Sequence, residues 1–331
     1  MTAVTEVSAP PAIRELSRRH RLRIAELLPW LIAVACFFVF PDYLALGTQI
    51  LISTLFALSL DLILGYGGVV TLGQAAFFGV GAYTAGILAV HGWTEPLTGL
   101  VAAGLVAAVL GMVTGVILLR TEGLTLLMLT LVVAAMIAEG ANKAGAWTGG
   151  ADGLQGITIS PILGLFRFDL FRRTSYVYAL VVLFLAWIAV RAIVHSPFGR
   201  SLTGIRENVT RMHAIGSPVL GRLVTAYAIA GALSGVAGAL LAQTEQFVSL
   251  EVLSFGRSGT VVIMLILGGA GRLYGAFVGV PLYMLAQDQL AEQFPIYWSS
   301  GIGFLLIAVA LGARGGVLDL WDGAVKRLRR R

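Results

Sequence analysis

The sequence is short of charge and of cysteine. Only 12% of its 331 residues are charged, whereas about 25% is usual for a soluble domain. The single cysteine, Cys36, cannot pair within the chain or build a cysteine-rich metal site. A soluble enzyme, a disordered chain and a disulfide-stapled domain are therefore excluded.

Sequence motifs of several enzyme classes are missing as well. The chain has no H-E-x-x-H, no G-x-S-x-G and no Cys–His arrangement. Its only lysines, Lys143 and Lys326, do not follow glycine, so the phosphate-binding G-x-x-x-x-G-K-[ST] is absent. We predict that the chain is not an enzyme, does not hydrolyse ATP by itself, and binds no metal or cofactor.

What the sequence does have is apolar residues, which make up 58% of the chain. Since a membrane-spanning helix needs about 20 of them, we predict an all-α polytopic membrane protein with about ten transmembrane helices, in a range of eight to ten. The apolar runs are 24–40, 43–64, 66–90, 97–118, 123–140, 175–195, 221–246, 257–270, 273–288 and 297–313. The run 257–270 is short and interrupted by glycine, so a half-helix or re-entrant segment there stays open.

Basic residues gather at the two ends of the sequence, between Arg14 and Arg23 and in the last six residues. If the N-terminus is inside, seventeen Lys and Arg residues fall on the inner side. The outer segments then hold only Lys143, Arg167, Arg172, Arg173 and Arg257. The positive-inside rule therefore predicts N-in and C-in termini. The net charge of +6 indicates contact with anionic membrane lipid, and we expect no nucleic-acid partner.

These features divide the chain into three parts. We predict a basic cytoplasmic tail over 1–23, a transmembrane domain over 24–313 and a second basic cytoplasmic tail over 314–331. Within the domain, 141–174 is a long outer loop and 196–220 a polar inner loop between the sixth and seventh spans. The start of the chain has the outline of a signal peptide, but no small-residue cleavage site follows Cys36. A retained first helix is therefore favoured.

Small residues recur at helical spacing in the third and seventh spans. Since helices in lipid associate through close packing of small residues, we expect close helix contacts there, with sliding during gating left open. The two stripes are Ala75, Gly79, Ala82, Gly86 and Gly231, Gly235, Gly238, Ala242.

A glycine-dense segment lies between the second and third spans. Gly65, Gly67, Gly68 and Gly73 either break a helix, as in transporter sites, or form a tight turn. The letters LILG occur at 62–65 and again at 265–268. Chance and internal duplication both remain open as explanations of that echo.

Few ionisable residues fall within the apolar runs: Asp61, Glu139, Arg191 and Glu245. Such residues are functional candidates, but each lies near a span end, where we expect its head group to reach water. No span carries a central carboxylate pair or a His–carboxylate relay. The sequence therefore argues against a secondary carrier driven by an ion gradient, which is the alternative function of another class.

The inner loop reads SPFGRSLTGIRENVTRMHAIGS from Ser196 to Ser217. Ser196 suits a helix N-cap, Pro197 the first helical position, and Gly216 the stop after the helix. The apolar stripe consists of Leu202, Ile205, Val209 and Met212. We predict a short amphipathic helix or helix pair, and its periodicity leaves open whether it lies on lipid or docks into a partner.

Three blocks together resemble one known family. They are GYGGVVTLGQAAFFGVGAYTAG at 65–86, TGGADGLQG at 148–156, and the stretch from Phe198 to about Gly275 with FGRSLTGIREN and LILGGAGRLYG. The chain is identified by them as a member of the ABC-importer permeases of branched-chain amino acid uptake, of the LivM type. The resemblance covers most of the chain beyond residue 45. One departure is that Glu207 is followed by Asn208-Val209-Thr210-Arg211, where many relatives carry an alanine cluster.

The resemblance implies a bacterial inner-membrane permease that pairs with a homologous, LivH-like second permease. It also implies two cytoplasmic ABC ATPase subunits, which bind ATP and Mg²⁺, and a periplasmic solute-binding protein. ATPase coupling would involve Gly199, Arg200, Ile205, Arg206, Glu207, Arg211 and Gly216. The translocation path would involve Gly65, Gly67, Gly68, Thr71, Gly73 and Gln74. The loop facing the binding protein would present Thr148, Gly149, Gly150, Asp152 and Gly153.

The expected mechanism is alternating access, in which ATP-driven closure of the partner subunits moves the inner loops and rocks the helices. Branched-chain amino acids are the expected cargo. Urea or short amides are the alternative for the same type of complex, since pore residues do not name the solute.

Overall fold

The computed structural model describes residues 28–161 and 173–294, together with Ser300, Gly301, Gly303, Ile307, Gly316, Val317 and Asp319. The predicted tail 1–23 lies outside the described residues, as do Arg167 and Arg172 of the outer loop. Most of the run 297–313 and of the tail 314–331 lies outside them too.

The regular elements of the described segments are all helices, with no β-strand among them, which confirms the all-α prediction. Leu154 and Val248 form one isolated antiparallel bridge. The α-helices are α2 (Leu28–Val39), α3 (Leu44–Asp61), α4 (Gln74–Val90), α5 (Pro96–Leu118), α6 (Gly123–Lys143), α7 (Gly145–Thr148), α8 (Arg173–His195), α9 (Pro197–Glu207), α10 (Val209–Ala214), α11 (Val219–Glu245), α12 (Phe255–Gly268) and α13 (Gly275–Gln293). The short elements are the 3₁₀ turns η2 (Pro41–Tyr43), η4 (Gly150–Asp152) and η5 (Leu250–Leu253), and the π-helical turn η3 (Leu62–Tyr66).

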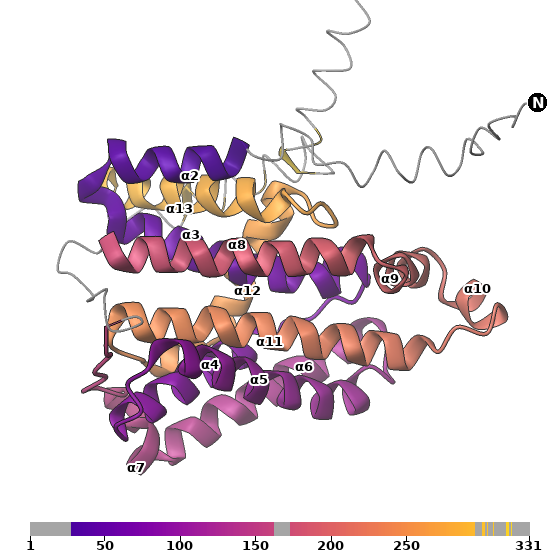
Figure 1. Cartoon of the computed structure of the whole chain (residues 1–331). Coiled ribbons are helices and arrows are strands. Elements are labelled where there is room, and N and C mark those ends of the chain that lie inside the picture. The colour runs from indigo at the N-terminus through magenta and orange to yellow at the C-terminus, as the bar shows by residue number, and fades with distance from the viewer. Residues whose placement is uncertain are drawn as a thin grey trace, which may run out of the picture.

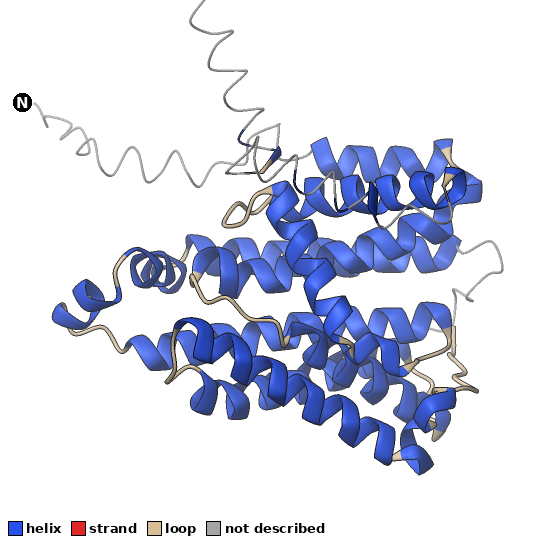
Figure 2. Ribbon diagram, turned by 180° about the vertical axis from the view of Figure 1, so that it is seen from behind, coloured by secondary structure: helices blue, strands red, loops and turns tan. Residues whose placement is uncertain are grey.

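Two helices form the centre of the bundle. The apolar windows of α3 and α11 are each 72% buried, compared with 17% for α6. α11 packs on α4 and α5, and α3 packs on α11, α8 and α13. Figure 1 shows α2, α13, α3 and α8 as one group and α11, α4, α5 and α6 as a second. α12 runs obliquely between the two groups and touches both (Figure 2).

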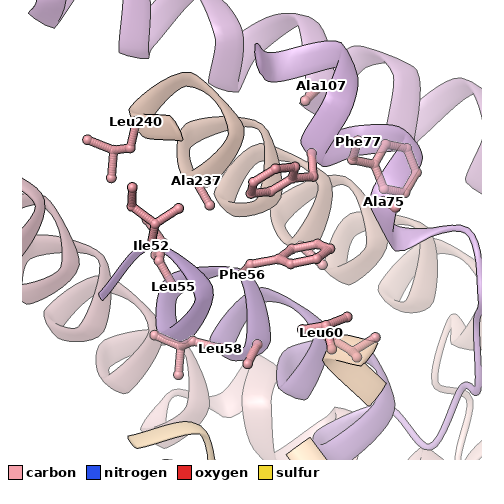
Figure 3. Close-up of a cluster of buried hydrophobic side chains, with 14 of the residues drawn as sticks. Ile52, Leu55, Phe56, Leu58, Leu60, Ala75, Phe77, Ala107, Ala237 and Leu240 are labelled. Atoms are coloured by element: carbon pink, nitrogen blue, oxygen red, sulfur yellow. The ribbon is translucent and has the colours of Figure 1, made fainter. Parts of the chain in front are cut away.

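The core between α3, α4 and α11 combines large side chains with small ones. Ile52, Leu55 and Phe56 of α3 lie opposite Ala237 and Leu240 of α11 (Figure 3). All five side chains are buried. Close packing of this kind brings helices together in lipid, where no hydrophobic effect drives them to associate.

The two predicted small-residue stripes pack on different neighbours. On α11, Gly235 meets Ala103 and Ala107 of α5, and Gly238 meets the backbone of Phe78 in α4. In the stripe of α4, Gly79 instead lies under Leu253 of η5, and Gly86 meets Leu154 and Ile157. The predicted close packing is therefore confirmed.

Five described helical stretches are long and apolar enough to cross a membrane: Pro41–Tyr66, Pro96–Leu118, Gly123–Lys143, Arg173–His195 and Val219–Glu245. Leu28–Val39, Gln74–Val90 and Phe255–Gly268 are shorter apolar helices. The polytopic prediction agrees with this arrangement, while the count of about ten spans and the N-in, C-in orientation stay predictions. The predicted run 66–90 is helical only from Gln74, since Gly68 turns the chain with φ +72°.

One face of α6 presents large apolar side chains outward. Leu124, Met128, Val132 and Met136 follow one another at intervals of four residues, and all are exposed. A soluble protein seldom exposes a contiguous apolar stripe of this size. Such a stripe suits contact with lipid or with a second membrane subunit.

The contact at Gly238 gives a stability prediction. A Cβ at Gly238 would overlap the carbonyl oxygen of Phe78, whereas a Cβ at Gly221 of the same helix meets no described atom within 4 Å. We expect Gly238→Ala to lower the free energy of unfolding by about 1–3 kcal/mol through overpacking. Gly221→Ala should raise it by about 0.5–1 kcal/mol. Unfolding of the purified chain in detergent measures both, and equal values for the two variants would contradict the contact.

Candidate functional site

The loop between α8 and α11 folds as two short helices, as predicted. Ser196 Oγ accepts a hydrogen bond from the Gly199 amide at 3.3 Å and so caps α9. Asn208 has an extended backbone, ends α9 and caps α10 by accepting from the Arg211 amide at 2.8 Å. Gly216 follows α10 with φ +77°, the conformation that a glycine stop requires. Figure 1 shows α9 and α10 projecting beyond the ends of α8 and α11.

The predicted apolar stripe of this loop is divided between the two helices. Leu202 and Ile205 of α9 are buried, and Met212 of α10 packs with its sulfur over Gly204. Val209 is exposed. Among the predicted coupling residues, Gly199 and Ile205 are therefore internal, and the others lie on the exposed side: Arg200, Arg206, Glu207, Arg211 and Gly216.

Arg206 lies exposed on α9 yet reaches into the bundle. Its Nη1 donates a hydrogen bond to the carbonyl oxygen of Gly65, at the end of the π-helical turn η3. One turn earlier, Asp61 Oδ1 accepts a hydrogen bond from the Gly271 amide at 2.7 Å. We call Asp61, Gly65, Arg206 and Gly271 the clasp. It joins α9, the end of α3 and the turn between α12 and α13.

The clasp corrects one sequence-based expectation. Asp61 does not reach water, because it is only 1% exposed. It lies beneath Gly65, where a Cβ would overlap its carboxylate. Glu139 matches the expectation, since it is exposed and pairs with Lys143 at 3.6 Å.

The glycine-dense segment connects the π-helical turn η3 to α4 inside the bundle. Residues 67–73 are not helical, and α4 begins at Gln74, which is fully buried. The Gln74 amide Nε2 donates to Ser59 Oγ at 3.2 Å and to the Ala230 carbonyl at 3.4 Å. Its Oε1 accepts no hydrogen bond from the described residues. The glycines therefore end one helix and precede the next, which agrees with both predicted alternatives, and a role as a transporter site stays a prediction.

The other predicted path residues are packed against neighbouring helices. Thr71 is fully buried, and a Cβ at Gly73 would come within 2.8 Å of the Thr130 carbonyl in α6. The Leu72 amide donates to Thr130 Oγ1 at 3.4 Å. From Gly68 to Gln74 the chain thus contacts α9, then α6, then α11.

The residues predicted to face the binding protein lie around α7, at the end of the bundle opposite α9 and α10 (Figure 1). Thr148 is buried and donates to the Ala141 carbonyl at 2.6 Å. Gly149, Gly150 and Gly153 all have positive φ. Asp152 is exposed at the tip. The segment is tied to the α11–η5 connection because the Leu154 amide donates to the Val248 carbonyl at 2.8 Å.

Two hollows lie in the surface of the described chain, one beside α9 and one beside α6. One of about 540 Å³ is at the junction of α8 and α9 and is lined by Arg191, His195 and Arg200 among others. The other, of about 380 Å³, lies between α6 and the η5–α12 corner. Neither is lined by residues 65–74. In the part of the chain that the structure describes, no group of three or more His, Cys, Asp or Glu could hold a metal ion.

Several buried polar residues around the site were not predicted from the sequence. Ser59, Ser234 and Ser258 are buried and bond residues 74 and 75: Ser234 Oγ donates to the Gln74 carbonyl, and the Ala75 amide donates to Ser258 Oγ at 2.9 Å. Gly271 also gave no signal by itself. The repeated LILG letters at 62–65 and 265–268 suggested chance or duplication, and neither predicts that the two segments touch.

Comparison with known proteins gives a consistent result. The profile of the family described as "Branched-chain amino acid transport system / permease component" matches residues 43–311. The chain is 27% identical over 344 residues to the high-affinity branched-chain amino acid transport system permease protein LivM of Salmonella typhimurium, covering 96% of this chain and 80% of the relative.

Two further relatives carry similar names. The LivM protein of Escherichia coli K12 is 26% identical, covering 94% of this chain and 77% of the relative. A probable LivM protein of Methanocaldococcus jannaschii is 25% identical, covering 75% and 81%. No solved structure matches the chain significantly.

Proposed function

Since the chain belongs to the family of branched-chain amino acid transport system permease components, we propose that it is a permease subunit of an ABC importer. With a second, homologous permease it forms the translocation pathway, and ATP hydrolysis on partner subunits drives transport. The observation that carries this proposal is the family match over residues 43–311. The relatives named as such permeases support it.

The projecting α9–α10 pair is the proposed docking element for the ATPase subunits. Its exposed side presents Arg200, Glu207 and Arg211 on two capped helices, outside the apolar bundle. An amphipathic helix with a buried apolar face and a charged outer face suits insertion into a partner's groove. ATP and Mg²⁺ are bound by those partners, and this chain contributes the lever that moves with them.

We propose that α9 and α10 face the cytoplasm and that the segment 148–153 faces the periplasm, where the solute-binding protein docks. The two elements lie at opposite ends of the bundle (Figure 1), and the positive-inside distribution selects the direction. The exposed apolar face of α6 contacts lipid or the second permease in the bacterial inner membrane.

Branched-chain amino acids are the proposed cargo, because the relatives are named for their transport. The glycine-dense segment and Gln74 are placed at the translocation path in this proposal. Broken helices next to buried polar groups commonly form transporter sites. Movement of α9 would then alternate access to that path.

ATP-dependent uptake tests the function directly. The chain is reconstituted in vesicles with a candidate second permease, ATPase subunits and solute-binding protein. Radiolabelled leucine should enter only when ATP and all partners are present, and unlabelled isoleucine and valine should compete. If only urea or short amides compete with the labelled leucine, they are the transported solutes in place of branched-chain amino acids. Uptake without the ATPases that a protonophore abolishes would overturn the proposal.

A further inference from the structure

The clasp lies where three parts of the chain that are distant in sequence come together. Gly65 ends the first LILG segment, Asp61 directly precedes that segment, and Gly271 lies three residues after the second one. Asp61 and Gly271 are 210 residues apart and share a 2.7 Å hydrogen bond. Arg206 adds α9 to the same point through the Gly65 carbonyl.

Glycines leave just enough room for the Arg206 side chain. A Cβ at Gly68 would lie 2.8 Å from Arg206 Cγ, and one at Gly271 would lie 2.5 Å from Arg206 Nη1. Both glycines have positive φ, at +72° and +79°. The side chain therefore lies in a cradle that only glycine can form on either side.

The clasp also encloses a buried acidic side chain. Asp61 is 1% exposed, its Oδ1 accepts from the Gly271 amide, and its Oδ2 has no hydrogen-bond partner among the described residues. Burying a polar group is costly unless it is hydrogen-bonded. The Gly271 bond to Asp61 and the Arg206 bond to Gly65 therefore hold the end of α3 from two sides.

We propose that Arg206 is a positioning residue that couples α9 to the translocation path. Through Gly65 and Asp61 it ties α9 to the end of α3 and to the α12–α13 turn, so these segments move together with α9. The glycine-dense segment 67–73 continues directly from this point. Arg206 thus acts inside the permease and is not needed to hold the ATPase. This inference rests on the proposed importer function.

The test compares four variants in the reconstituted complex. Arg206→Gln removes the charge, and Gly68→Ala fills the cradle while residue 206 stays arginine. Gly92→Ala is the matched control, because Gly92 also has positive φ, at +93°, but no described atom within 4 Å of its Cβ. Arg206→Lys keeps the positive charge on a different head group. It is the second test of the clasp if Gly68→Ala does not fold.

Three quantities are measured for each variant: ATPase subunits retained on purification, ATP hydrolysed, and leucine taken up. We expect Arg206→Gln and Gly68→Ala to keep the ATPase bound but to lower uptake per ATP by at least about fivefold, the lower end of coupling between distant sites. Arg206→Lys should recover part of that ratio, and Gly92→Ala should leave it unchanged.

Other outcomes would overturn the proposal. Loss of the ATPase subunits in Arg206→Gln would make Arg206 a docking residue. A parallel fall of hydrolysis and uptake, with the ratio constant, would indicate a merely structural role. An unchanged ratio would show that the clasp carries no coupling. If the wild-type complex shows no ATP-dependent uptake, the importer function itself fails, and this result is distinct from all the others.

Discussion

Reversing two charges on the exposed side of α9 and α10, Arg200→Glu with Arg211→Glu, is expected to detach the ATPase subunits and to abolish ATP-dependent uptake. Both residues are exposed on the projecting pair of helices. Since exposed positions tolerate substitution within about 0.5 kcal/mol, the permease itself should fold normally. Co-purification of the ATPase subunits and uptake of labelled leucine are the measurements.

The size of the expected loss follows from charge complementarity. Apart from Arg206, which reaches into the bundle, the exposed side of the pair carries Arg200 and Arg211 against the single carboxylate of Glu207, so the groove that receives it should be acidic. Like charges brought together at an interface cost several kcal/mol. Each 1.4 kcal/mol is a factor of about ten in affinity. The double variant should therefore lose at least about tenfold in binding.

Arg120→Glu provides the control, because Arg120 is exposed in the turn between α5 and α6 and belongs to no proposed site. It changes the net charge in the same direction and should leave binding and uptake intact. Equal losses in the control and the double variant would point to a general charge effect. Full binding by the double variant would remove α9 and α10 from the ATPase interface.

Local features of the fold were predictable because their signals are local. Ser196, Pro197 and Gly216 mark the start and stop of the inner helix pair, and the structure uses each as predicted. Asn208 carried a signal too, since asparagine is a favoured N-cap. It explains why the predicted stripe is broken into two helices, with Val209 turned outward.

The polar contacts of the site could not be predicted, because they join residues distant in sequence. Asp61 near a span end suggested access to water, but its partner Gly271 lies 210 residues away and closes over it. The bonds from Gln74 to Ser59 and Ala230 likewise cross between helices. Periodicity shows which face of a helix is apolar, but it does not show which neighbour that face meets.

The second large effect is expected for Gln74→Leu, which should leave stability nearly unchanged but lower uptake at least about tenfold, a change of about 1.4 kcal/mol. Leucine has nearly the same volume, and it removes a buried unpaired oxygen, which offsets the loss of the Nε2 bonds to Ser59 and Ala230. Ser59 keeps its bond to the Phe56 carbonyl at 2.6 Å. The substitution also removes the carbonyl Oε1, which has no partner among the described residues. A buried polar atom left unpaired calls for a functional explanation.

Gln243→Leu is the matched control, because Gln243 is also buried but both ends of its amide are bonded. Its Nε2 donates to the Pro96 carbonyl, and its Oε1 accepts from the Tyr178 hydroxyl, each at 2.8 Å. Removing it breaks both of these bonds, so we expect a loss of about 1–3 kcal/mol in stability and normal uptake per folded complex. Uptake and unfolding measured together separate the two glutamines. If Gln74→Leu transports normally, Gln74 has only a packing role, and the path lies elsewhere in the bundle.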